Sequence, residues 1–282
     1  MTVSAAPRLA TLLLAGSLLA GVAQAASAQT TPAPAAKGKI PDAHALTAIA
    51  RQRIQAADLR ASGHLVRVDA SGNRISFPIT VKARWFPGVL RILVEIGSNQ
   101  KTVTNSLVSA HIPAHVLLEM RPNGQNAIQI AQPGDKAPAT LPFDKWTDGP
   151  LGPGFSYEDF FEQQYFWPGQ TVVEQTKFGA RNCDILKSTP GRDDRTHYAE
   201  IKTWLDHSIV FPVYLEKTLK GSGAVKEFTY FGLRHDGGVW SATQVEAKTR
   251  GQAGTTMLII DRGSTKANLT LGDFSPEQLI RF

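Results

Sequence analysis

The chain has 282 residues and a formal net charge of +6, and 42% of its residues are hydrophobic against 19% that are charged. This balance is too apolar for a disordered chain, and a single cysteine excludes an intramolecular disulfide and any multi-cysteine metal site. The basic residues are scattered, and we interpret the densest groups, Arg51/Arg53 and Arg192/Arg195, as surface charge. We therefore expect no nucleic-acid binding.

Residues 1–25 have the pattern of a cleavable signal peptide. Arg8 precedes an apolar run of about 14 residues, and Ala23-Gln24-Ala25 supplies the small residues that a signal peptidase recognises. The run is shorter than the roughly 20 residues that a membrane span needs, so an uncleaved anchor is the weaker alternative. We expect export, to the periplasm in a bacterial cell, with residues 26–41 as a flexible tether rich in Ala and Pro.

The remaining residues, 42–282, are expected to form one domain. A helix capped by Asp42 should run to about Ala61, before Gly63. Strand-like alternation follows, interrupted by turn-forming Gly, Pro, Asn and Asp residues. The expected strands are 64–69, 75–86, 89–96, 115–121, 126–131, 171–178, 183–188, 197–206, 209–219, 225–234, 239–248 and 255–261. Alternation in the second strand places Ile79, Val81, Ala83 and Trp85 on one face and Thr80, Lys82 and Arg84 on the other.

The middle of the chain breaks this pattern. Residues 132–155 resemble a loop, after which Ser156 is expected to cap a short helix, with Asp159 as its capping partner. The helix has an aromatic face backed by an acidic one. Its aromatic residues are Tyr157, Phe160, Phe161 and Tyr165, and its acidic residues are Glu158, Asp159 and Glu162.

These elements predict a mainly β fold of about ten antiparallel strands in two blocks. A meander of this length must curl, because an open sheet exposes its edges and one apolar face. The sequence therefore predicts a strongly curved sheet or incomplete barrel, with helices over its concave side. Such a shape encloses a cavity rather than a filled core.

Catalytic and metal-binding patterns are not evident. His111 and His115 are separated by Pro113, and in an extended chain they would lie about 13 Å apart, too far to share a metal ion. Ser156 lacks the second glycine of a nucleophile elbow, which favours a role as a helix cap. Cys183 is interpreted as a small buried hydrophobic residue. We therefore expect no catalytic residue, no metal and no cofactor.

An aromatic signal remains in the first hairpins and the central loop. One interpretation is that these residues are ordinary core, and the other is that some line a cavity under a movable lid with Pro and Gly hinges. The ligand-cavity and lid candidates are Trp85, Phe155, Tyr157, Phe160, Phe161 and Tyr165.

The segment Leu151-Gly-Pro-Gly-Phe-Ser-Tyr-Glu-Asp-Phe160 resembles a hallmark of the LolA-like outer membrane lipoprotein-sorting protein family. The resemblance covers roughly residues 42–282. Further segments that resemble the family are Lys202–Asp206 with Pro212–Lys217, Val239–Ala242 with Gly254–Thr256, and Asp273–Leu279.

The resemblance implies a half-open antiparallel β-barrel with a helical lid, whose hydrophobic cavity binds acyl chains. An exported carrier of lipoprotein or other lipid is the function it implies, with membrane donor and acceptor proteins as further partners, and we expect a monomer. An arginine that governs cargo release in LolA carriers has no match here, so no release residue is carried over. The alternative is a periplasmic sensor or interaction protein of the same fold, which binds a protein partner.

Overall fold

The computed structural model describes residues 40–97, 114–149 and 152–282. The expected signal peptide and nearly all of the expected tether lie outside the described residues, as does His111. Among the described residues, no helix has both the length and the apolar character that a membrane crossing requires.

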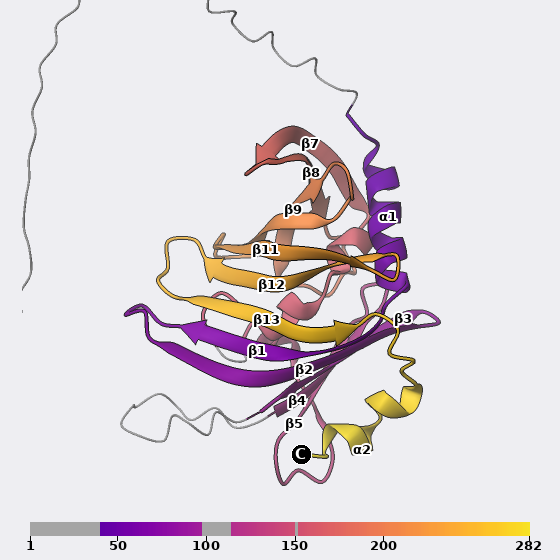
Figure 1. Ribbon diagram of the computed structural model, residues 1–282, viewed down its shortest axis with the longest axis vertical. Coiled ribbons are helices and arrows are strands. Elements are labelled where there is room, and N and C mark those ends of the chain that lie inside the picture. Colours follow the sequence, from indigo (N-terminus) through magenta and orange to yellow (C-terminus); the bar gives the residue numbers. More distant parts are fainter. Residues whose placement is uncertain (1–39, 98–113, 150–151) are drawn as a thin grey trace, which may run out of the picture. The chain divides into compact units, whose positions relative to one another are not determined.

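Thirteen antiparallel strands form one open, curved sheet in the described part of the chain (Figure 1). Its order is β6-β5-β4-β3-β2-β1-β13-β12-β11-β10-β9-β8-β7, so two meanders are joined where β1 pairs with β13. The strands are β1 (Asp58–Val68), β2 (Arg74–Phe86), β3 (Val89–Ile96), β4 (Ala114–Met120), β5 (Ala127–Ala131), β6 (Ala139–Thr140), β7 (Gly169–Phe178), β8 (Arg181–Thr189), β9 (Tyr198–Asp206), β10 (Pro212–Leu219), β11 (Val225–Asp236), β12 (Val239–Thr249) and β13 (Thr255–Ser264).

The predicted fold class is confirmed, and each predicted strand overlaps an observed one. The short strand β6 was missed, because two residues with exposed side chains carry no alternation. The helix prediction was wrong at its end: α1 (Ala43–Gln55) stops before Ala61, which lies buried in β1. Residues 58–63 pair with β2, and from Arg60 also with β13, so long-range ladders override the local helical pattern.

The two free edges of the sheet, β6 and β7, are consecutive in the sequence. The chain between them, residues 141–168, therefore passes from one edge to the other, and we call it the crossing segment. Its described part contains short 3₁₀ turns in place of the single helix expected after Ser156. These turns are η1 (Phe143–Lys145), η2 (Tyr157–Phe160) and η3 (Gln163–Phe166).

The inner face of the sheet is the one that packs against α1 and the crossing segment. Leu46, Ala50 and Ile54 form the buried stripe of α1. They join a main core with inner-face side chains of β1 to β5, such as Leu65 and Val94. A second cluster on the same face lies over β9 to β12. Its buried members are Phe155, Trp167, Tyr198, Ile201, Leu215, Phe228 and Ala247.

The outer face of β3 to β5 is covered by the end of the chain. Leu93 and Leu117 pack there against Phe274 and Leu279. These two residues belong to the turn η4 (Leu271–Phe274) and the helix α2 (Pro276–Leu279), which begins with Pro276 after Ser275. Both ends of the domain therefore serve to cover the first meander.

The β1–β13 junction is sensitive to the size of residue 63. A register shift falls between Ser62 and Gly63, and a Cβ at Gly63 would overlap the carbonyl oxygen of Ile259. We predict that Gly63→Ala lowers the free energy of unfolding by about 3 kcal/mol, measured by urea denaturation.

Gly263→Ala is the matched control, because it adds the same methyl group to the same pair of strands. Its Cβ would lie 3.3 Å from the Cβ of Ala61, which requires only a small adjustment. A loss of about 1 kcal/mol or less is expected, and equal losses for the two variants would contradict the role assigned to Gly63.

Candidate functional site

The crossing segment approaches the sheet closely at Gly154. This residue has φ of +79°, and a Cβ there would lie 2.5 Å from the Cα of Lys248 in β12. The Thr256 hydroxyl donates a 2.8 Å hydrogen bond to the Pro153 carbonyl. Phe155 then enters the second cluster, 6.2 Å from the Phe228 ring. The Gly-Pro-Gly-Phe sequence thus fits a backbone that lies directly on the strands.

Asp159 fixes the segment to the inner face through charge. Its carboxylate lies 3.1 Å from the Lys217 Nζ and 2.8 Å from the Lys226 Nζ, and the Tyr198 hydroxyl donates to it at 2.6 Å. All of these side chains are buried. An unpaired charge is costly in a buried site. Removal of one of these side chains would therefore leave the others buried without a partner.

The two lysines also decide the protonation state of Asp159. Burial alone would raise the pKa of this carboxyl, but the ammonium groups of Lys226 and Lys217 and the bonds from Lys226 and Tyr198 outweigh burial. The pKa of Asp159 consequently lies well below its ordinary value, and the carboxylate stays charged.

Glu158 makes a second anchor beside the first. Its carboxylate accepts hydrogen bonds from the Thr196 hydroxyl at 2.5 Å and from the Gln163 amide at 3.2 Å. The His197 Nδ1 lies 2.8 Å from the other carboxylate oxygen. The acidic face expected on a helix surface is therefore buried at these two positions. Sequence analysis missed their partners, which, apart from Gln163, lie on strands or loops 38 to 67 residues further along the chain.

Ser156 acts as the predicted cap. Its backbone N–H and its hydroxyl both donate to the Asp159 carboxylate, at 2.8 and 2.7 Å. Lys226 lies 2.8 Å from the hydroxyl oxygen, but this lysine is paired with Asp159 and does not offer a free amine to act as a base. Ser156 is also only 1% exposed. This arrangement stabilises a turn and leaves the hydroxyl out of reach of a substrate.

Three arginines that the sequence analysis interpreted as surface charge contact the crossing segment. They are Arg51, Arg53 and Arg195. Arg51 Nε donates to the Tyr165 carbonyl at 2.6 Å, and Arg53 Nη2 pairs with Glu162 at 2.9 Å. The Arg195 guanidinium lies 5.0 Å from the ring centroids of both Phe143 and Trp146. The interpretation as surface charge was wrong for Arg51 and Arg53, which are partly buried against a distant part of the chain, while Arg192 and Arg195 are exposed as predicted.

Five of the six predicted residues lie in the crossing segment, and the sixth lies on β2. Phe161 and Tyr165 are buried in the main core, Phe155 is buried in the second cluster, and Tyr157 and Phe160 are partly buried. Trp85 stacks on Phe166 of the segment, with ring centroids 5.9 Å apart. The structure therefore brings the six together around one segment, while their role in binding stays a prediction.

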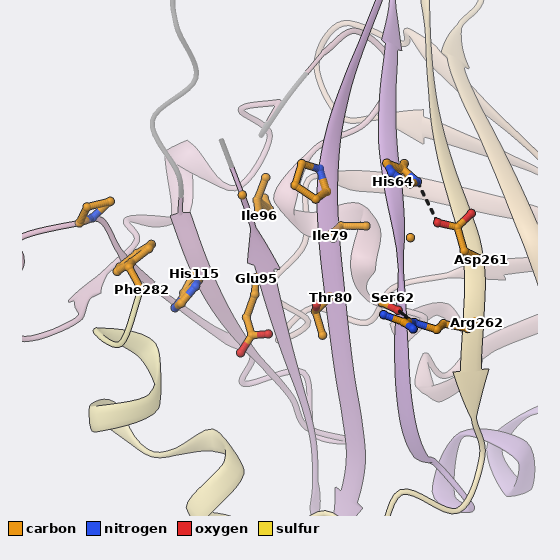
Figure 2. A pocket seen from close by; sticks show the side chains of 14 residues that line it. Ser62, His64, Ile79, Thr80, Glu95, Ile96, His115, Asp261, Arg262 and Phe282 are labelled. Carbon is orange, nitrogen blue, oxygen red and sulfur yellow. Dashed lines mark hydrogen bonds and ion pairs between the residues drawn. The ribbon is translucent and has the colours of Figure 1, made fainter. Parts of the chain in front are cut away.

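A cavity of about 730 Å³ lies elsewhere, lined mainly by outer-face side chains of β13, β1, β2 and β3 (Figure 2). Its carboxylates are already paired: Asp261 with His64 at 2.9 Å and Glu95 with Lys82 at 2.7 Å. None of the six predicted residues lines it. Sequence analysis gave no sign of this cavity, because its lining comes from several strands that meet only in the folded sheet.

No metal centre is evident in the part of the chain that the structure describes. Within residues 40–97, 114–149 and 152–282, no three His, Cys, Asp or Glu residues are grouped so that they could hold an ion. The expected absence of a cofactor is not tested by this observation.

Comparison with known proteins places this geometry in a known fold. A family model described as "Uncharacterized protein" matches residues 146–281, and no curated protein matches the chain. The chain is similar in structure to a domain from Vibrio parahaemolyticus named as an outer membrane lipoprotein-sorting protein. The TM-score is 0.71 at 17% identity, over 85% of this chain and 100% of that one.

Two further solved structures share the architecture. A DUF1329 family protein from Desulfovibrio piger gives a TM-score of 0.70 at 13% identity, over 84% of this chain and 98% of that one. A LolA superfamily protein from Nitrosomonas europaea gives 0.55 at 13% identity, over 82% and 99%. The LolA-like resemblance drawn from the sequence is thus confirmed at the level of the fold.

We predict that Asp159→Asn lowers the free energy of unfolding by about 3–5 kcal/mol, because it leaves two buried ammonium groups without a counter-charge. Asp193→Asn, in an exposed turn, is the control and should change stability by less than about 0.5 kcal/mol. Chemical denaturation at several pH values measures both.

The loss of stability caused by Asp159→Asn should change with pH in a defined direction. The folded-state pKa of Asp159 lies below its ordinary value of 3.8, so the wild type keeps this contribution above about pH 4 and loses it as the pH falls. The deficit of Asp159→Asn should be full at neutral pH and shrink in acid. A deficit that grows in acid would contradict the assignment.

Proposed function

We propose that the protein is an exported, non-enzymatic carrier that binds the acyl chains of a lipoprotein or another lipid on the inner face of its sheet. The crossing segment would be displaced to admit them, with outer membrane lipoprotein sorting as the corresponding process and the periplasm as the location. The main support is one observation: the segment that joins the two sheet edges also plugs the inner face with aromatic side chains.

The inner face offers apolar surface to such a ligand. Beside the buried cores, several of its side chains remain partly exposed around the crossing segment. They come from four strands in the middle of the sheet. These side chains are Val81, Trp85, Tyr230, Val245 and Leu258.

The contacts of the segment divide it into a fixed and a movable part. Glu158 and Asp159 tie η2 to the sheet through buried charge. By contrast, η3 is held mainly by apolar packing and by Arg51 and Arg53 of α1, with Gln163 hydrogen-bonded to Asn126 and to Glu158. An acyl chain can replace apolar packing with equivalent packing, but it cannot replace the buried counter-charges of Asp159. The Arg53–Glu162 pair is partly exposed, so water can replace it when η3 moves. The aromatic residues from Phe160 to Phe166 would therefore move while residues 156–159 stay in place.

The energetics are favourable for acyl chains. Each buried CH₂ contributes about 0.8 kcal/mol, so one or two chains supply useful affinity even after displacement of the aromatic plug. A ligand without long apolar chains would not recover that cost. This reasoning favours lipid over small polar molecules as the ligand.

The direct test is native mass spectrometry of the exported protein, with solvent extraction of whatever co-purifies. Bound phospholipid or acylated peptide is expected, and Phe160→Asp should reduce uptake of offered lipid roughly tenfold, a factor that corresponds to 1.4 kcal/mol. Phe160 is preferred to the buried Phe161, where a new carboxylate would unfold the domain.

Phe231→Asp is the matched control. Phe231 is 44% exposed on β11, opposite Gln244, whose amide reaches Met257 on the outer face. The Phe231→Asp variant should take up lipid as the wild type does. A clean apo mass with no uptake by the wild type would overturn the carrier proposal, and a persistent protein partner would then favour the sensor or interaction alternative.

A further inference from the structure

A row of polar side chains crosses the outer face of the sheet from β4 to β13. His115, Glu95, Thr80, Ser62 and Arg262 are direct partners in successive ladders, and we call these five residues the polar row. All five line the cavity of about 730 Å³, and Figure 2 shows them one after another across the strands. Neighbouring strands lie about 4.8 Å apart, so the row is roughly 19 Å long.

The bulge between β1 and β13 adds a further polar side chain to the cavity. Arg262 pairs with Ser62 and Ile260 pairs with Gly63, so Asp261 has no partner on β1. Consecutive side chains of a regular strand point to opposite faces, and a bulge interrupts this alternation. Asp261 and Arg262 consequently both line the cavity. Bulges often direct a side chain toward a functional site, and this one directs Asp261.

Contacts within the protein hold these side chains and leave donors and acceptors free. Arg262 Nε donates to the Ser62 hydroxyl at 3.0 Å, and its two Nη groups have no partner among the described residues. Asp261 places one carboxylate oxygen 2.9 Å from the Nδ1 of His64, which leaves its other oxygen available. The Thr80 hydroxyl, in the middle of the row, is partly exposed and can both donate and accept.

The fixed charges of the site balance. Asp261 and Glu95 are the anions, Arg262 is one cation, and Lys82, 2.7 Å from Glu95, is the other. Such a set does not select a charged ligand, whereas hydroxyl groups bond to donors and acceptors alike. The strands β1, β2 and β3 are paired on both sides, so they offer no free edge to an extended peptide. A neutral ligand with many hydroxyl groups therefore fits this cavity best.

We propose that the polar row binds a neutral, linear oligosaccharide on the face opposite to the proposed lipid site. The length of the row favours several linked sugar rings over a single one. At its end Phe282 is 50% exposed and stacks on His115, with ring centroids 4.0 Å apart. An aromatic surface thus adjoins the polar row and can pack against the apolar face of a sugar ring. This inference goes beyond the proposed function and does not rest on it.

The test is isothermal titration calorimetry of the full exported protein with maltotriose, cellotriose and chitotriose. At least one trisaccharide is expected to bind with a Kd of about 1 mM or tighter, and its single sugar roughly tenfold more weakly. The double variant Thr80→Val/Arg262→Gln removes free groups of the polar row without unpairing a buried charge. It should weaken binding of that trisaccharide roughly tenfold.

The matched control is Thr229→Val/Arg234→Gln. Both residues lie on β11 with the same exposure classes as Thr80 and Arg262, and neither lines the cavity. This control should bind the trisaccharide as the wild type does, and both double variants should take up lipid normally. The inference is overturned if no trisaccharide binds or if the row variant binds equally well. Tighter binding of a single sugar or of anionic trigalacturonic acid would also overturn it. None of these results would affect the carrier proposal, which lipid uptake tests separately.

Discussion

The Asp159 carboxylate, buried between the ammonium groups of Lys217 and Lys226, is the interaction on which the inner face depends. An open sheet of this length must cover its apolar side, and here the chain between the two free edges does so. Apolar packing alone would not fix where that chain lies, because aromatic side chains fit many places. A buried charged group is stable only beside its counter-charge, so the Asp159 carboxylate can occupy only one position.

That constraint also separates the two tasks of the crossing segment. Its fixed part, up to Asp159, needs partners that only this sheet provides. Its aromatic part, from Phe160 to Phe166, depends mainly on apolar contacts that a lipid chain could also provide, beside the polar contacts of Arg51, Arg53 and Gln163. A carrier that opens without unfolding, as proposed, needs this division.

Sequence alone was sufficient for the strands, since side-chain alternation is a local signal. Segment 75–86 shows this, because Ile79 and Ala83 are buried in the main core as the alternation requires. The end of α1 was misjudged, because residues 58–63 have a helical pattern but find strand partners on both sides. Strand pairing between distant segments cannot be predicted from a short stretch of sequence.

The aromatic residues of the candidate site could be identified from the sequence, but its buried charges could not. The loop with Phe155, Phe160 and Phe161 was identified from composition and from the family resemblance. The burial of Glu158 and Asp159 was not, because an acidic residue usually marks a solvated surface. Only the register of β10 and β11 brings Lys217 and Lys226 opposite each other, and a register is set by the whole sheet.

The central claim is that one part of the crossing segment moves for a ligand while the adjoining part stays fixed. Hydrogen–deuterium exchange, measured with and without an acylated lipid, tests it most directly. The account predicts that lipid changes exchange at residues 160–167 and on the partly exposed strands of the inner face, while residues 156–159 remain protected in both states. No change at 160–167, or equal loss of protection across 156–167, would contradict it.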